Sequence, residues 1–189
     1  MNHTAIVILC GDISRRMSVC KAQLTVNGKR LYEIVRQNLS PLQIPTFIAS
    51  KIDLHCDNLV MDFFVEDTPL SGILTAMTEL HFEEYVFVPV DMPLLTSDMI
   101  GPILERSNRD VSAFYTVNGF LQPFPAFLKS DATHLIRKCF LNHCYRLTDV
   151  FSHLPSTLIP FEGNLDYFLN INTWEDWHAF RSLCVNRFE

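Results

Sequence analysis

Residues 6–21 read Ile-Val-Ile-Leu-Cys-Gly-Asp-Ile-Ser-Arg-Arg-Met-Ser-Val-Cys-Lys, and this stretch decides the fold. The apolar run at residues 5–9 has no polar alternation, which is typical of a strand buried on both faces of a parallel sheet. The chain then becomes polar and brings the cations Arg15, Arg16 and Lys21 into one short loop. Because open α/β sheets bind ligands outside the carboxyl ends of their strands, the pattern predicts an anion site there, with a polyphosphate as the favoured ligand.

The loop matches neither of two common phosphate-binding motifs. It has no Gly-x-x-x-x-Gly-Lys-Ser/Thr, which excludes a P-loop, and no Gly-x-Gly-x-x-Gly, which excludes a dinucleotide fingerprint. An anion site formed by these cations would therefore belong to another class.

Composition and charge bound the possible functions. The 189 residues, 48% hydrophobic and 19% charged, fit one globular domain over residues 1–189. The formal net charge of -6 disfavours nucleic acid and anionic membrane surfaces as partners. The sequence shows no basic leader and no apolar run long enough to cross a bilayer. We expect a soluble, cytoplasmic protein.

The six cysteines form no Cys-x-x-Cys pair, so free thiols in a reducing compartment are expected. Cys139, His143 and Cys144 lie close together, but their spacing is wrong for zinc. We interpret them as ordinary residues of a helix face.

Strands and helices alternate through the first half of the chain, which predicts a parallel sheet with right-handed crossovers. Asn27-Gly28 marks a tight turn. Strands are expected at residues 5–9, 24–26, 46–49, 58–65 and 85–90, and helices at residues 29–39 and 71–80.

The second half predicts an antiparallel addition to that sheet. Residues 110–117 and 120–128 read as two strands around Asn118-Gly119, a hairpin. A helix from Ser97 is expected to be interrupted or delayed by Gly101-Pro102. A helix is expected at residues 132–140, capped by Ser130 or Asp131, and a short helix at 147–154. An edge strand follows at 158–161. The last helix is expected from Trp174, and a capping box of Thr173 and Asp176 begins it. Together the elements predict a three-layer, Rossmann-like α/β sandwich with a mostly parallel sheet and one antiparallel strand.

Asp91 and Lys21 are the sharpest candidates for chemistry. Asp91 directly follows the apolar run at residues 86–90, so it is expected at the same crevice as the loop after Leu9. Mg²⁺ takes one or two carboxylates and bridges phosphate oxygens; the alternative is that Asp91 only caps a turn before Pro93. Lys21 would neutralise the charge on a leaving pyrophosphate, or it belongs to a solvated cationic loop.

The order of these motifs resembles that of nucleotidyltransferases of the molybdenum cofactor guanylyltransferase (MobA) type. The family's Leu-Ala-Gly-Gly, Arg-Met-Gly and Asp-Lys correspond here to residues 9–12, 16–18 and 20–21, and its strand-Asp-x-Pro segment corresponds to residues 90–93. The family's Asn-Val/Ile-Asn-Thr signature matches residues 170–173, and Gln122-Pro123 matches its hairpin segment. The resemblance covers nearly the whole chain.

The resemblance implies a set of site residues. Lys21, Arg16 and Asp91 would be catalytic, with Asp91 as the Mg²⁺ ligand. Asp67 matches the family aspartate before Gly-Pro-Leu-Ala-Gly, although a helix cap is an equal alternative for it. The residues implied in nucleotide binding are Leu9, Cys10, Gly11, Asp12, Lys21, Ser50, Asp67 and Asp91.

The resemblance also implies the reaction, which is transfer of GMP from GTP to the molybdenum–molybdopterin cofactor with release of pyrophosphate. The implied partners are GTP, molybdopterin, and molybdoenzymes or other proteins of cofactor biosynthesis. Two alternatives stay open: a related nucleotidyltransferase for CTP or a sugar phosphate, and a non-catalytic homologue that binds the cofactor or a molybdoenzyme.

Three residues depart from the family pattern, namely Asp12, Ser18 and Cys20. Glycine at the end of such a strand lets backbone amides approach phosphate. Asp12 replaces one of these glycines with a carboxylate that faces a polyanion. We therefore expect nucleotide affinity to be reduced, shifted or lost.

Overall fold

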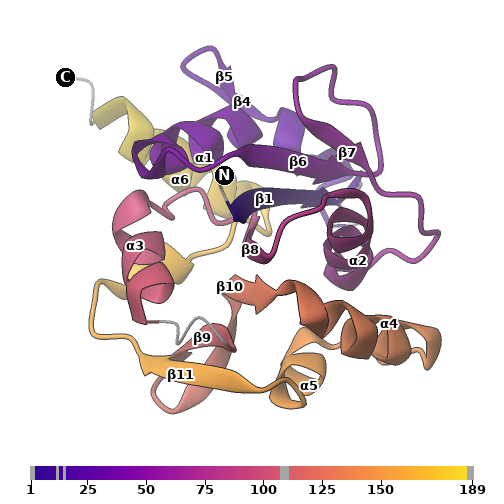
Figure 1. The fold of residues 1–189 in the computed structure, drawn as a ribbon. Helices are drawn as coiled ribbons and strands as arrows, with labels where there is room; N and C mark the ends of the chain where they lie inside the picture. Colours follow the sequence, from indigo (N-terminus) through magenta and orange to yellow (C-terminus); the bar gives the residue numbers. More distant parts are fainter. Residues whose placement is uncertain (1–2, 12, 15, 107–110, 187–189) are drawn as a thin grey trace.

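A seven-stranded sheet forms the centre of the computed structural model, which describes residues 3–11, 13–14, 16–106 and 111–186 (Figure 1). The strand order is β11-β9-β10-β8-β1-β6-β7. The strands are β1 (Thr4–Gly11), β6 (Thr46–Ser50), β7 (Leu59–Met61), β8 (Glu84–Pro89), β9 (Ser112–Val117), β10 (Phe120–Lys129) and β11 (Ser156–Pro160). β10 runs antiparallel to both of its neighbours, and the other pairings in this sheet are parallel. The expected mostly parallel sheet with one antiparallel strand is confirmed.

Helices cover both faces of the sheet, which gives the expected three layers. In Figure 1, α1 (Leu31–Leu39) and α3 (Ser97–Arg106) lie on one face. The opposite face carries α2 (Pro69–Glu79), α4 (Thr133–Leu141) and α5 (Leu147–Ser152). β1 pairs with β6 on one side and β8 on the other, and residues 5–8 are fully buried. The uninterrupted apolar run of this strand follows from burial on both faces.

Two Asn-Gly turns close hairpins, of which the one at residues 118–119 was expected. Asn118 and Gly119 have φ values of 51° and 79° between β9 and β10, as a two-residue turn of this kind requires. Asn27 and Gly28 likewise join β4 (Thr25–Val26) to β5 (Lys29–Arg30). Because residues 29–30 pair with β4, α1 begins at Leu31 and not at residue 29.

Besides the start of α1, three other predictions were wrong. β7 ends at Met61, not at residue 65, because the Asp62 carboxylate accepts a hydrogen bond from Phe64 N at 3.1 Å and turns the chain away from the sheet edge. α3 continues through Pro102. Proline has no N–H to donate to the carbonyl of Asp98, but Asp98 is exposed, so water can hydrogen-bond to that carbonyl instead. Neither Ser130 nor Asp131 caps α4; these residues open a short 3-10 turn (Ser130–Ala132) before it.

The edge strand and the last helix are present as expected, although β11 covers residues 156–160 and not 158–161. β11 lies at the sheet edge, where Pro160 is tolerated. α6 (Trp174–Asn186) opens with the expected capping box, in which Asp176 N donates to Thr173 Oγ1 at 3.2 Å and Thr173 N donates to Asp176 Oδ2 at 2.8 Å.

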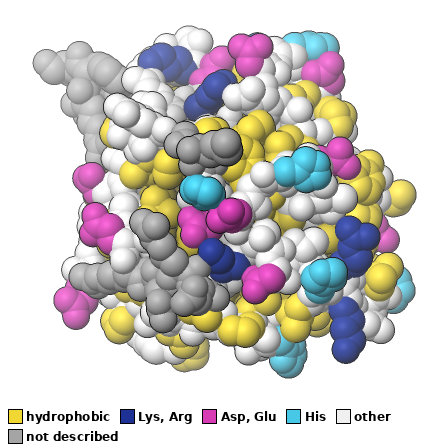
Figure 2. Space-filling view, in the orientation of Figure 1, with side chains coloured by type: hydrophobic (Ala, Val, Ile, Leu, Met, Phe, Trp, Pro, Cys, Tyr) yellow, Lys and Arg dark blue, Asp and Glu magenta, His cyan; other side chains and the backbone are white. Residues whose placement is uncertain are grey.

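The distribution of basic side chains on the surface is consistent with the formal net charge of -6. On the face drawn in Figure 2, the described Lys and Arg side chains are dispersed among acidic and apolar ones and form no continuous basic patch of the kind nucleic acids bind. Among the described helices, none has the length and apolar character needed to span a bilayer.

Candidate active site

A cavity of about 470 Å³ opens where β1, β6 and β8 reach their carboxyl ends. Val90 N donates to Leu9 O at 3.0 Å, which holds the tips of β8 and β1 side by side. The expectation that these two strand tips share a pocket is confirmed. Six of the nucleotide-binding residues expected from the sequence line the cavity: Leu9, Cys10, Gly11, Lys21, Asp67 and Asp91.

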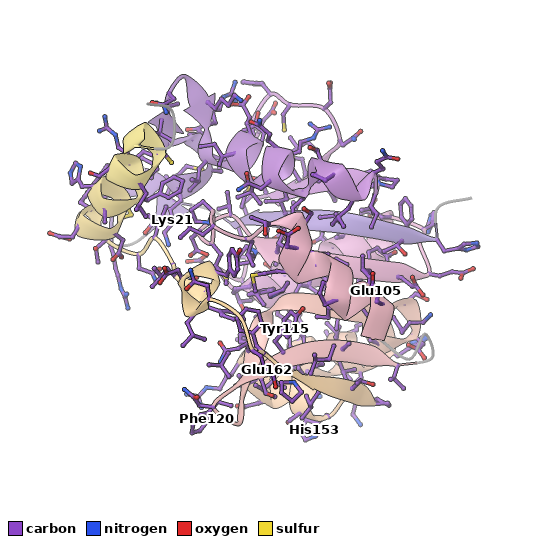
Figure 3. The ribbon with its side chains drawn as sticks, turned by 90° about the vertical axis from the view of Figure 1, so that its left-hand side faces the viewer. Lys21, Glu105, Tyr115, Phe120, His153 and Glu162 are labelled. Atoms are coloured by element: carbon purple, nitrogen blue, oxygen red, sulfur yellow. The ribbon has the colours of Figure 1, made fainter. Side chains whose placement is uncertain are left out.

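Lys21 joins three segments that are distant in sequence. Its Nζ donates to Asp91 Oδ2 and to Asn172 Oδ1, both at 2.9 Å. The two charged side chains are 14% and 24% exposed, so the pair is partly shielded from water. Figure 3 shows Lys21 beside the yellow helix α6, in the upper half of the view, with the labelled Phe120 at the bottom. A lysine and a carboxylate in contact at the mouth of a cavity can together hold a polyphosphate and its counterion.

The loop after β1 brings Lys21 back to the strand tips. β2 (Ile13–Ser14) and β3 (Val19–Cys20) pair as a small antiparallel ribbon within this loop. Ser18 has a positive φ of 56° at its turn. The ribbon delivers Lys21 at the start of a 3-10 turn (Lys21–Gln23), so the spacing between Gly11 and Lys21 follows from a hairpin and not from a phosphate-binding helix terminus.

Asp176 positions Asn172 from the first turn of α6. Asn172 N and Thr173 N both donate to Asp176 Oδ2, at 2.9 and 2.8 Å. These hydrogen bonds, first that of Asn172, lower the pKa of the Asp176 carboxyl. Ile171 N also donates to Asp91 O at 2.8 Å. The carboxyl-terminal helix is therefore part of the site.

A second lysine–carboxylate pair, not expected from the sequence, lines the same cavity. Lys51 Nζ lies 3.2 Å from Asp62 Oδ2, and their side chains are 12% and 4% exposed. The sequence feature that could have predicted this pair is the position of Asp62, which comes after a short apolar strand as Asp91 comes after β8. The apolar residues Phe63, Phe64 and Val65 extended the expected strand beyond Asp62 and concealed that position.

The other expected site residues lie in different places. Ser50 is fully buried and is not among the residues that line the cavity; its Oγ donates to Gly11 O at 3.5 Å and accepts from Ile52 N at 3.2 Å. Arg16 is exposed and does not line the cavity. Thr68, not Asp67, caps α2, because Thr68 Oγ1 accepts from Leu70 N. Asp12 and Arg15 lie outside the described residues.

Gly11 and Cys10 line the cavity at the end of β1. Gly11 has a φ of +61°, a backbone conformation that favours glycine. A Cβ atom added at this position would have no other atom within 4 Å, so crowding is not the reason for the glycine. Cys10 is 5% exposed, and burial raises the pKa of its thiol, with Cys20 and Cys56 adding to the effect. A neutral buried thiol is a poor nucleophile, so Cys10 serves as a packing residue.

Comparison with known proteins identifies the family. The sequence model described as "MobA-like NTP transferase domain" matches residues 6–156. The chain belongs to this family. It is therefore a nucleotidyltransferase, and the resemblance expected from the sequence motifs is confirmed.

Relatives agree with the family along the whole chain. A protein of Natranaerobius thermophilus named "Probable molybdenum cofactor guanylyltransferase" is 26% identical over 95% of this chain and 96% of its own length. The solved structure of molybdopterin-guanine dinucleotide biosynthesis protein A from Archaeoglobus fulgidus superposes with a TM-score of 0.78 at 19% identity, covering 96% and 99% of the two chains. A nucleotidyl transferase from Methanothermobacter gives 0.77 at 13% identity, covering 99% and 100%. These MobA-like and other nucleotidyltransferases share the fold of this chain.

Proposed function

We propose that this nucleotidyltransferase transfers GMP from GTP to the molybdenum–molybdopterin cofactor and releases pyrophosphate. The observation that carries the proposal is the contact of Lys21 with Asp91 and Asn172 at the mouth of a cavity formed by strand tips. The names of the relatives support the choice of guanine nucleotide and of acceptor.

The reaction joins two phosphates. A terminal phosphate oxygen of molybdopterin attacks the α-phosphorus of GTP, a new P–O bond forms, and the bond from the α-phosphorus to the β-phosphate oxygen breaks. Negative charge accumulates on the departing pyrophosphate, where the Lys21 ammonium neutralises it. The remaining contribution of the protein is positioning, since phosphoryl-type transfer needs little covalent help.

Asp91 suits a magnesium ion that is held mainly by the nucleotide. Mg²⁺ typically uses one or two protein carboxylates and takes its other ligands from substrate phosphates and water. The described residues contain no group of three or more His, Cys, Asp or Glu that would form an all-protein metal cage. With Asp91 as the main protein ligand and the Asn172 amide oxygen beside it, bound Mg²⁺ would supply charge neutralisation of the phosphates.

The aromatic part of the cavity wall suits the acceptor. Phe124, Phe168 and Gln122 all line the cavity. Aromatic rings bind flat heterocycles by stacking, and an amide can hydrogen-bond to their polar edges. We place the pterin on this wall, with its phosphate directed toward Lys21, and we place the reaction in the cytoplasm, where the free cysteines stay reduced.

Pyrophosphate release tests the proposal. Purified protein with Mg²⁺, GTP and molybdopterin should release pyrophosphate and form a guanine dinucleotide, whereas CTP should not replace GTP. Asp91→Asn keeps the size of the side chain and should lower the rate by about 10²–10³-fold, as loss of an electrostatic stabiliser does.

Glu84→Gln is the matched control, because Glu84 pairs with Lys129 at 3.2 Å outside the cavity. Turnover with CTP but not with GTP would show that the protein is a related nucleotidyltransferase and not a guanylyltransferase. Binding of GTP or molybdopterin without any turnover would indicate a non-catalytic homologue.

A further inference from the structure

The Lys51–Asp62 pair has no role in the chemistry described above, although it lines the same cavity. Lys51 follows β6 directly and Asp62 follows β7 directly, whereas Asp91 lies just beyond β8. In the sheet order β8-β1-β6-β7, three spacings of about 4.8 Å separate β8 from β7. The cavity therefore has a phosphate end at Lys21 and Asp91 and a second polar end about 14 Å across the sheet.

The carboxylate at this second end already has its hydrogen-bond donors. Asp62 Oδ1 accepts from Phe64 N at 3.1 Å and from Thr75 Oγ1 at 3.0 Å. Asp62 Oδ2 accepts from Ser71 Oγ at 2.6 Å and lies 3.2 Å from Lys51 Nζ; the Ser71 hydroxyl also lies 2.7 Å from Thr68 O. A carboxylate with both oxygens occupied in this way is a poor metal ligand and a poor acceptor for a ligand, so Asp62 acts as the anchor of Lys51.

Lys51 retains hydrogen-bonding capacity. Its ammonium group has three protons, and within the described part of the chain Nζ contacts two acceptors, Asp62 Oδ2 and Phe64 O. One proton is therefore left for a ligand in the cavity. Because the pair has no net charge, it suits a neutral polar group better than another phosphate.

We propose that Lys51 reads the nucleobase by donating this proton to a ring carbonyl oxygen, so that the site accepts 6-oxopurines and rejects adenine. The inference rests on the proposed function, because it needs the triphosphate at Lys21 and the base at the other end of the cavity. Guanine and hypoxanthine present a carbonyl acceptor at position 6, whereas adenine presents an amino donor there. An ammonium group facing that amino group would be left without an acceptor, which costs affinity.

Nucleotide binding in the presence of Mg²⁺ tests this role. ITP and ATP are the informative probes, because they differ at the position-6 edge and both lack the 2-amino group of guanine. The wild-type protein should bind ITP at least about tenfold more tightly than ATP, the effect of one hydrogen bond to a charged donor. Lys51→Met should bring this ratio close to one by weakening ITP, and Lys51→Arg should keep most of it.

Two further variants keep the test sharp. The double variant Lys51→Met with Asp62→Asn avoids an unpaired buried carboxylate and should lose the ITP preference in the same way. Lys129→Met breaks a comparable pair, 20% and 15% exposed, outside the cavity, and should keep the preference.

The outcomes separate this inference from the proposed function. Equal binding of ITP and ATP by the wild-type protein, or an unchanged ratio in Lys51→Met, would overturn the base-reading role while guanylyl transfer in the pyrophosphate assay stands. Equal weakening of ITP and ATP in Lys51→Met would also overturn it, because Lys51 would then contact phosphate or ribose. A wild-type protein that binds no nucleotide would overturn both.

Discussion

Lys21 Nζ lies 2.9 Å from Asp91 Oδ2, although 70 residues separate the two in sequence. A small ribbon after β1 delivers the lysine, and β8 delivers the aspartate. The contact places a cation and a carboxylate at adjacent strand tips without a glycine-rich phosphate loop. In the contact, the Lys21 ammonium and the Asp91 carboxylate neutralise each other. A bound polyphosphate with its metal ion can replace the contact, because the phosphate pairs with Lys21 and the metal ion pairs with Asp91.

Lys21→Met should abolish most activity and also lower stability. We expect pyrophosphate release to fall by about 10²–10³-fold, because a preorganised charge opposite the leaving group is lost. The free energy of unfolding should fall by about 1–3 kcal/mol, because Asp91 Oδ2 and Asn172 Oδ1, which are partly shielded from water, lose their donor. Urea denaturation and the pyrophosphate assay measure the two effects. An equal loss of activity in Lys129→Met would contradict a specific role for Lys21.

Asp176→Asn should affect both the site and the pH dependence of stability. The pKa of the Asp176 carboxyl is lowered in the folded protein, so its contribution to stability is present above the ordinary aspartate pKa of about 3.9 and is lost as the pH falls through the folded-state value. The stability difference between wild type and variant should therefore be larger at pH 7 than at pH 3. Urea denaturation at the two pH values measures it.

Nucleotide binding by the same variant tests the connection to the site. Asn172 loses a charged acceptor for its backbone N–H, so Lys21 should be held less firmly and GTP should bind more weakly. Glu175→Gln removes a neighbouring exposed charge from the same helical turn and should leave GTP binding unchanged. Weakening by both variants would point to the helix terminus as a whole.

Asp12→Gly should tighten GTP binding. Asp12 follows Gly11, a residue that lines the cavity, and it replaces a family glycine with a negative charge. Removing that charge should improve affinity by about fivefold, which corresponds to about 1 kcal/mol for two unit charges a few ångströms apart in water. Calorimetry with GTP and Mg²⁺ measures the change. Equal affinity of variant and wild type would mean that the substitution is harmless.

Thr96→Val should stabilise the protein. Thr96 Oγ1 is buried and has no hydrogen-bond partner among the described residues. Valine has nearly the same shape without the polar atom, so the free energy of unfolding should rise by about 1 kcal/mol. Thr75→Val is the contrasting control, because Thr75 Oγ1 donates to Asp62 at 3.0 Å, and that variant should be destabilised. Chemical denaturation that orders the two variants in the opposite way would refute the assignment.

The fold followed from local patterns whose physical causes are strong. The apolar run of β1, the Asn-Gly turns and the Thr173–Asp176 capping box each allow few conformations, and each was predicted. The end of β7 was not predicted, because one hydrogen bond from Phe64 N to Asp62 outweighed the strand preference of the apolar residues that follow. Pro102 was expected to interrupt or delay a helix, but α3 continues through it. The Asp98 carbonyl that proline leaves without a donor belongs to an exposed residue, so water can hydrogen-bond to it.

The candidate site was predictable where it depends on strand ends. Gly11 ends one apolar strand and Asp91 lies just beyond another, so their proximity follows from parallel pairing of the two strands. The Lys51–Asp62 pair depends on where a three-residue strand stops, and the contact of Lys21 with Asn172 depends on where the last helix packs. Neither leaves a periodic signal in the sequence.

The dependence of Lys21 on Asn172 has a consequence during synthesis. The stretch that matches the family ends at residue 156, and the seven strands of the sheet are complete by Pro160. A nascent chain of that length can pair all of its strands, but its lysine still lacks the amide that holds it. The site is therefore completed only when the segment that carries Asn172 has been made and Trp177 and Phe180, the buried side chains of α6, have packed into the core.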